Sequence, residues 1–290
     1  MKNLNTLFFV ILFLSYSTSL FAQKEGRIGI FTGVAKTGLI NADDVKTGDL
    51  LPTFKGAFGV EGGYFITIGR RVPFGLTGFA SYAGGGQNYL GKYSDSSFYE
   101  AYTRLRYMKG GAAFQFGSNM RRQVSLNAHI GVCFSSLTGY SDRYEHFQAN
   151  GDRYVLAIKN KSIYLDNDSI LTGGLDNEMY NKVDYNLYGG LGVDILFTHN
   201  LVFSVFTRFE SGMLSVENLD KKKITLDTKP VSTIMDLPIE NIKVKYHTPV
   251  ETQPVRAETM NSSMGIFISF KYRFVNTKDN EIWYRQPVRN

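Results

Sequence analysis

Residues 183–197 read VDYNLYGGLGVDILF, and the alternation within this stretch decides the fold. Its odd positions are apolar apart from Gly189, whereas its even positions are polar or small. A period of two is typical of a β-strand with one apolar face and one polar face. The stretch is far longer than the usual strand of about 5–6 residues. Long strands of this kind are typical of the β-barrels that cross the bacterial outer membrane.

The same alternation recurs in seven other segments, so eight strands are expected. The seven segments are residues 27–35, 55–68, 74–82, 99–116, 124–137, 201–212 and 262–274. In the fourth strand, residues 99–116, the pattern changes phase near Lys109-Gly110-Gly111, which predicts a β-bulge there.

The connections between these strands alternate in length. Residues 69–72, 117–123 and 198–200 are short, whereas residues 36–54, 83–98, 138–182 and 213–261 are long. Short periplasmic turns and long extracellular loops are expected of an outer-membrane barrel. A β-sandwich has no reason to alternate in this way, and it would bury its apolar faces. The predicted fold is therefore all-β, an antiparallel up-and-down transmembrane β-barrel.

The number of strands depends on residues 153–165, which have a hairpin pattern around Lys159-Asn160-Lys161. Either this hairpin extends above the membrane, or it supplies two more spanning strands and the barrel has ten. We predict eight, because Lys159 and Lys161 need an aqueous environment.

The start of the chain is typical of a secretory signal peptide. Lys2 supplies the positive charge, residues 7–14 are apolar, and Ala22 is the predicted cleavage site. We therefore expect a signal peptide at residues 1–22, the barrel at residues 23–274 and a periplasmic tail at residues 275–290. Both termini of the mature chain would be periplasmic.

An eight-stranded barrel is only wide enough for side chains to fill its interior. Unpaired charges in such a lumen are costly, so the charged residues with inward parity are expected to pair. A plug of salt bridges is predicted, with a narrow ion path as the alternative. The predicted network comprises Glu61, Arg104, Arg106, His129, Asp184, Asp194, Arg208, Glu210, Lys271 and Arg273.

No catalytic, metal or cofactor site is predicted. The chain has four histidines, of which His129 alone falls within a predicted strand, and Cys133 is the single cysteine. There is no Gly-x-Ser-x-Gly elbow and no P-loop. The net charge of +6 is spread along the chain without a basic stripe, which excludes nucleic acid as an expected partner.

The long loops and the tail are the expected interaction surfaces. Lys221-Lys222-Lys223 could contact outer-membrane lipid or lipopolysaccharide. Trp283 and Tyr284 form an aromatic pair that could dock a protein partner. The leading hypothesis is a non-enzymatic assembly, adhesion or surface-binding component. The alternatives are a membrane-embedded enzyme acting on lipid or lipopolysaccharide, and a narrow channel.

Four segments resemble the outer-membrane β-barrel proteins of Bacteroidetes, in the broad PorT-like group. They are Phe21-Ala22-Gln23, residues 29–33 (GIFTG), residues 189–194 (GGLGVD) and residues 265–274 (GIFISFKYRF). The resemblance implies an outer-membrane barrel, in a group that includes a secretion-system component. The last segment also resembles the signal read by the barrel-insertion machinery. It departs from that signal because 16 residues follow Phe274.

Overall fold

A computed structural model describes most of the chain. The described residues are 23–41, 50–51, 53–68, 72–94, 97–117, 123–147, 151, 153–160, 162–165, 169–174, 180–198, 200–217, 225–226, 229–230 and 258–275. The predicted signal peptide and Trp283 and Tyr284 in the predicted tail lie outside them. Among these residues there is no helix with the length and apolar character needed to cross a membrane.

The described residues form β-strands of very unequal length. The strands are β1 (Gln23–Ile40), β2 (Leu50–Leu51), β3 (Thr53–Ile68), β4 (Val72–Ser94), β5 (Ser97–Gly117), β6 (Val124–Phe147), β7 (Arg153–Lys159), β8 (Ser162–Leu165), β9 (Ser169–Gly174), β10 (Val183–Thr198), β11 (Leu201–Ser215), β12 (Thr225–Leu226), β13 (Lys229–Pro230) and β14 (Met260–Val275).

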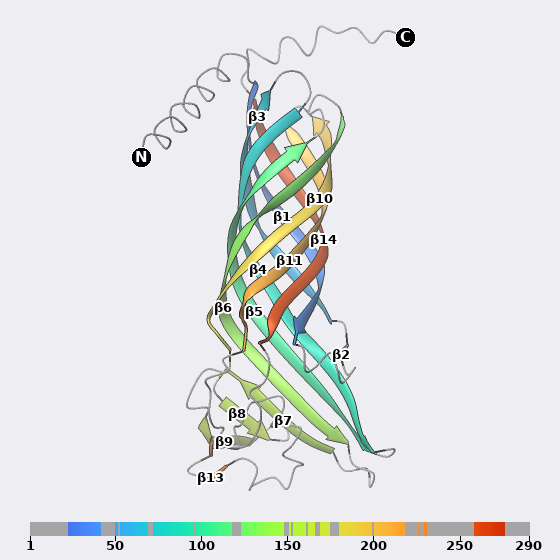
Figure 1. Ribbon diagram of the computed structural model, residues 1–290, viewed down its shortest axis with the longest axis vertical. Coiled ribbons are helices and arrows are strands. Elements are labelled where there is room, and N and C mark those ends of the chain that lie inside the picture. Colours follow the sequence, from blue (N-terminus) through green and yellow to red (C-terminus); the bar gives the residue numbers. More distant parts are fainter. Residues whose placement is uncertain are drawn as a thin grey trace, which may run out of the picture.

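Eight of these strands close into a barrel (Figure 1). Their order around the barrel is β1, β3, β4, β5, β6, β10, β11 and β14, and every neighbouring pair is antiparallel. The first and last strands pair from Glu25 opposite Val275 to Ile40 opposite Met260. Because this pairing completes the ring, the predicted eight-stranded antiparallel barrel is confirmed.

The strands β7, β8 and β9 lie outside the closed ring. β7 pairs with the far part of β6, β8 pairs with β7, and β9 pairs with β8. The ten-stranded alternative is therefore wrong, and residues 153–165 form the expected hairpin beyond the barrel. Asn160 makes its turn in the left-handed region, at a φ of 54°.

The predicted long loop at residues 83–98 is largely a β-hairpin. β4 runs on to Ser94 and β5 begins at Ser97, and the two remain paired along this length. Together with residues 139–147 of β6 and the strands β7–β9, residues 83–107 form what we call the extension. Figure 1 shows these strands running on past the end of the barrel that is opposite the start of β1.

The outer face of the barrel is covered by exposed apolar side chains, which we call the belt. On β5 the belt runs from Met108 to Phe116, and on β6 it runs from Val124 to Phe134. These 9 and 11 residues match the roughly 9–11 residues of a tilted membrane-spanning strand. An apolar outer face with a polar interior is the reverse of a soluble barrel.

The polarity of the two faces inverts where β5 leaves the belt. Its outward residues change from Met108 to Arg106 and Arg104, while its inward residues change from Lys109 to Tyr107 and Leu105. No β-bulge occurs at residues 109–111, where both neighbouring pairings run without a break. The predicted bulge is therefore wrong. The apolar–polar pattern of β5 reverses because its outward side chains leave the belt and face water, while the strand itself stays regular.

An irregularity does occur nearby, on the neighbouring strand. The β5–β6 register shifts between Arg106 opposite Gly139 and Tyr107 opposite Leu137, which leaves Thr138 as the extra residue of a bulge on β6. The Thr138 hydroxyl donates to the Arg106 carbonyl oxygen at 3.1 Å. The bulge therefore marks the level at which the extension begins.

Candidate functional site

The end of the lumen near the start of β1 is closed by a chain of ion pairs. Arg273 lies 2.7 Å from Glu25, whose other oxygen accepts from Arg27 at 2.5 Å. Arg27 also reaches Asp194 at 2.7 Å, and Asp194 accepts from the Ser204 hydroxyl at 2.6 Å. All four charged side chains are buried, so each charge is offset inside the barrel rather than by water.

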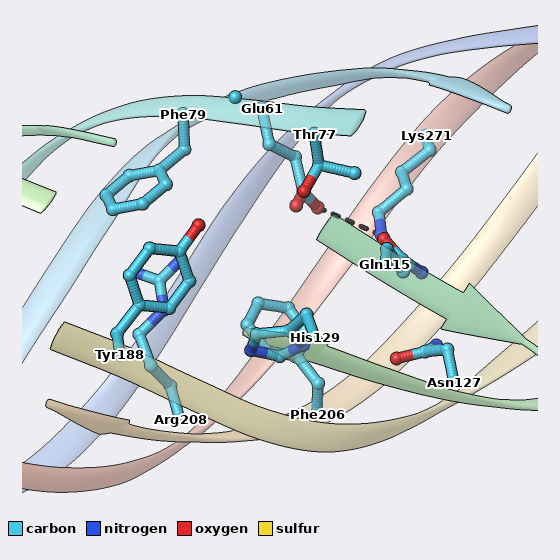
Figure 2. Close-up of a pocket in the computed structure, with 11 residues that line it drawn as sticks. Glu61, Thr77, Phe79, Gln115, Asn127, His129, Tyr188, Phe206, Arg208 and Lys271 are labelled. Atoms are coloured by element: carbon cyan, nitrogen blue, oxygen red, sulfur yellow. Dashed lines mark ion pairs between the residues drawn. The ribbon is translucent and has the colours of Figure 1, made fainter. Parts of the chain in front are cut away.

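A small cavity lies farther along the lumen (Figure 2). Its volume is about 30 Å³, and Lys271 and Glu61 close one side of it with an ion pair of 3.2 Å. His129 Nε2 and Asn127 Nδ2 are buried without a hydrogen-bond partner among the described residues. A polar cavity of this size holds one or two water molecules, which would satisfy those two nitrogens.

Arg208 lies beside the cavity inside a cage of aromatic rings. Its guanidinium carbon is 4.1 Å from the ring centre of Phe79 and 5.1 Å from that of Tyr188. Three more rings lie within 6 Å of it, those of Phe31, Phe206 and Phe267. Figure 2 shows Tyr188 and Phe79 beside the Arg208 side chain. Cation–π contacts of this kind are strongest where water is excluded.

Glu210 links Arg208 to the next part of the lumen. It lies 3.6 Å from Arg208 and makes a short ion pair with Lys109. The described lumen therefore holds charges in equal number, the basic Arg27, Lys109, Arg208, Lys271 and Arg273 and the acidic Glu25, Glu61, Asp184, Asp194 and Glu210. All of these side chains except Asp184 form ion pairs, and together they fill the lumen as a plug.

Most of the predicted network residues lie in this plug. Glu61, Asp194, Arg208, Glu210, Lys271 and Arg273 form ion pairs within it. His129 lines the cavity, and Asp184 is buried with one oxygen accepting from the Leu214 backbone N–H at 3.3 Å. The prediction for Arg104 and Arg106 is wrong, because both are exposed on the outward parity of β5.

The sequence analysis missed three members of the plug, Glu25, Arg27 and Lys109. Glu25 and Arg27 share the inward parity of Phe31 on β1, which could have identified them. Lys109 is not recognisable as a lumen residue from the sequence, because the change in polarity along β5 resembles a change in phase.

Beyond the belt, the mouth of the barrel is packed around Tyr180. The Tyr180 hydroxyl donates to Asp142 at 2.8 Å, and its ring packs against that of Tyr140. Burial, together with the carboxylates of Asp142 and Glu217, raises the pKa of Tyr180 well above its ordinary value. The phenol is therefore held neutral, and the extension is tied to the segment that precedes β10.

An open groove of about 650 Å³ lies on the extension. It is lined by Tyr102, Arg104, Ser141, Asp142, Arg143, Glu145, Ala157, Ile158, Lys159 and Tyr164. Two rows of residues cross the strands here. The first row runs from Arg104 through Ser141 to Lys159. The second row runs from Tyr102 through Arg143 and Ala157 to Tyr164. The groove thus has one polar, basic row beside one row that ends in tyrosines.

No protein-family model matches the chain, and no curated protein matches it. Solved structures similar to it include Ail, the attachment invasion locus protein of Yersinia pestis, in complex with the heparin analogue sucrose octasulfate. That structure is 12% identical and has a TM-score of 0.29, with 86% of this chain and 99% of that chain covered.

Two further structures are similar at the same level. Neisserial surface protein A is 9% identical with a TM-score of 0.29, covering 84% of this chain and 95% of that chain. OprG of Pseudomonas aeruginosa is 9% identical with a TM-score of 0.34, covering 88% of this chain and 97% of that chain. All these TM-scores are below 0.5, so none of these structures carries an argument about function.

Proposed function

We propose that this protein is an integral outer-membrane β-barrel that binds ligands at the cell surface through the extension. The observation that carries the proposal is the belt of exposed apolar side chains around a closed barrel with a charged interior. Such a belt is unfavourable in water and favourable in a bilayer. Outer-membrane lipid would surround the belt.

The proposed orientation places the extension outside the cell. The short connections lie at the same end of the barrel as the start of β1 and the end of β14, and the extension lies at the opposite end. Short turns on the periplasmic side and long segments on the outer side are usual for such barrels. Both termini of the mature chain would then be periplasmic. We also propose that the chain belongs to the PorT-like group.

The proposed role is non-enzymatic. Among the described residues, His129 lines the lumen cavity together with Arg208, and Cys133 is buried against Ser135. A lipid substrate would have to pass the plug to reach either side chain. Mass spectrometry of lipid A and phospholipids from a deletion strain tests this role, since an altered lipid would support the enzymatic alternative. A partner bound through the predicted tail is tested by crosslinking in native membranes.

Arginine substitutions at two depths of the same strand test the membrane proposal. Both Ala112 and Met108 face outward on β5, Ala112 at the middle of the belt and Met108 at its edge. In lipid vesicles we expect Ala112→Arg to lower the free energy of unfolding by about 2–4 kcal/mol and Met108→Arg by about 0–1 kcal/mol. Equal costs for the two variants, measured by urea titration, would contradict a bilayer around the belt.

A further inference from the structure

The carboxylates at the groove already have partners within the protein. Glu145 accepts from Arg143 at 2.5 Å and from Arg153, and Asp142 accepts from Tyr180. Nearby, Glu100 accepts from Tyr102, and this hydrogen bond raises the pKa of Tyr102 to about 12. Each of these carboxylates thus already has a hydrogen-bond donor within the fold, and the charge of Glu145 is offset by two arginines.

Two cations at the groove have no such compensation. Arg104 is exposed, as is Lys159, and neither has an ion-pair partner in the part of the chain that the structure describes. They flank Ser141 from the two adjacent strands. Neighbouring strands are about 4.8 Å apart, so the two Cα atoms are roughly 10 Å apart. An anionic group over the Ser141 hydroxyl could receive hydrogen bonds from both side chains.

The turn after β7 holds Lys159 in this position. The Asn160 backbone N–H donates to the Tyr140 carbonyl oxygen at 2.9 Å, and the Asn160 side-chain oxygen accepts from the Tyr140 N–H at 3.1 Å. This double link to β6 fixes the end of β7, on which Lys159 is the last residue. The cation row is therefore built into the sheet rather than carried on a free loop.

The neighbouring row supplies two tyrosine rings. Tyr102 and Tyr164 stand at its two ends, with Arg143 and Ala157 between them. Tyrosine rings provide a large contact area with a polar tip, which suits the apolar face of a sugar ring. Glu145 also lines the groove, but both of its oxygens already accept from Arg143 and Arg153.

We propose that this groove binds an anionic saccharide. Its carboxylate, sulfate or phosphate lies between Arg104 and Lys159 over Ser141, and its sugar ring lies along the row from Tyr102 to Tyr164. The inference rests on the proposed surface-binding function and gives it a ligand class. Such a sugar could come from a soluble glycan or from the headgroup of a glycolipid in the surrounding leaflet.

Calorimetry on the full chain in phosphatidylcholine nanodiscs tests the proposal, with trigalacturonate as the anionic probe and maltotriose as the neutral one. The test variant is Arg104→Gln with Lys159→Gln. The matched control is Arg106→Gln, which removes a cation from the same face of the same strand but outside the groove. We expect the double variant to bind trigalacturonate at least roughly tenfold more weakly, because it loses two charge-assisted hydrogen bonds. The control should bind within about twofold of the wild type.

The proposal would be overturned by no binding of trigalacturonate, by equal binding of maltotriose, or by an equal loss in the Arg106→Gln control. Binding of inorganic polyphosphate at the same strength would also overturn it, since that indicates charge alone. Repeating the titration in nanodiscs with lipopolysaccharide separates the sources, because a bound headgroup weakens trigalacturonate binding by competition. Heat-dependent migration on gels reports separately whether the barrel is folded and inserted. A folded, inserted protein that binds no trigalacturonate contradicts the groove proposal alone, whereas a protein that does not insert contradicts the barrel proposal.

Discussion

At the scale of single residues, Arg208 is the side chain on which the plug most depends. It is buried, pairs with Glu210 and lies within 6 Å of five aromatic ring centres. Glu210 also pairs with Lys109, so its carboxylate keeps an ion-pair partner if Arg208 is lost. The cost of losing Arg208 therefore comes mainly from the emptied aromatic cage.

Arg208→Ala should lower the free energy of unfolding by about 3–5 kcal/mol, the usual cost of truncating a large buried side chain and leaving a cavity. Arg208→Met should recover much of this loss, because methionine refills the cage and contacts aromatic rings favourably. Urea titration followed by heat-dependent gel migration measures both. An alanine variant as stable as the wild type would show that the cage contributes little.

Tyr180 makes the extension sensitive to alkali. Its pKa is raised in the folded protein, whereas the pKa of an unfolded tyrosine is about 10. Its contribution to stability is thus complete below pH 10 and is lost as the pH rises above that value. We expect protease sensitivity of the extension to rise between about pH 10 and 12, and Tyr180→Phe to flatten this dependence. An unchanged pH profile in the variant would contradict the assignment.

At the scale of elements, the long β4–β5 hairpin depends on a glycine. Gly86 has a φ of 124°, and a Cβ added to it would lie 2.0 Å from the Thr103 carbonyl oxygen. Both facts exclude a side chain, since that backbone conformation suits glycine alone and the neighbouring backbone cannot move away cheaply.

Gly86→Ala should therefore loosen the hairpin beyond the barrel while the barrel itself still forms. Gly110→Ala is the matched control, because a Cβ there would have its nearest neighbour at 3.8 Å. Limited proteolysis should cut residues 83–107 faster in the first variant only. Equal cleavage of both variants would show that the glycine conformation does not hold the hairpin.

The elements also show what the sequence could predict. Alternation located all eight barrel strands and the three short turns, because lipid-facing and lumen-facing residues contrast strongly within the belt. It failed for Arg104 and Arg106, because beyond the belt the outward face of β5 meets water and is polar, while its inward face is apolar. The groove could not be predicted, because Arg104, Ser141 and Lys159 meet only through the register of three strands.

At the scale of the whole molecule, the lumen of the barrel is blocked to ions. Its lumen charges are mostly ion-paired, its cavity of about 30 Å³ has room for only one or two waters, and aromatic rings surround Arg208. Moving an ion through this lumen would require several buried ion pairs to separate together.

The folded protein should therefore be electrically silent in planar bilayers at neutral pH. A porin in the same bilayers serves as the positive control, and heat-dependent gel migration confirms that the test protein is folded. Reproducible conductance steps from folded protein would mean that the plug opens, and would favour the narrow-channel alternative.

The pairing of β1 with β14 has a consequence for how the molecule folds. Every other pair in the barrel joins two barrel strands that are consecutive in the chain. The β1–β14 pair, which we call the seam, joins the first strand to the last. Contacts between distant parts of a chain form slowly, because loop closure is costly in entropy. Until the seam closes, the nascent sheet has two free edges that can recruit another chain. The protein is thus most prone to aggregate during folding, after β14 has formed and before it pairs with β1.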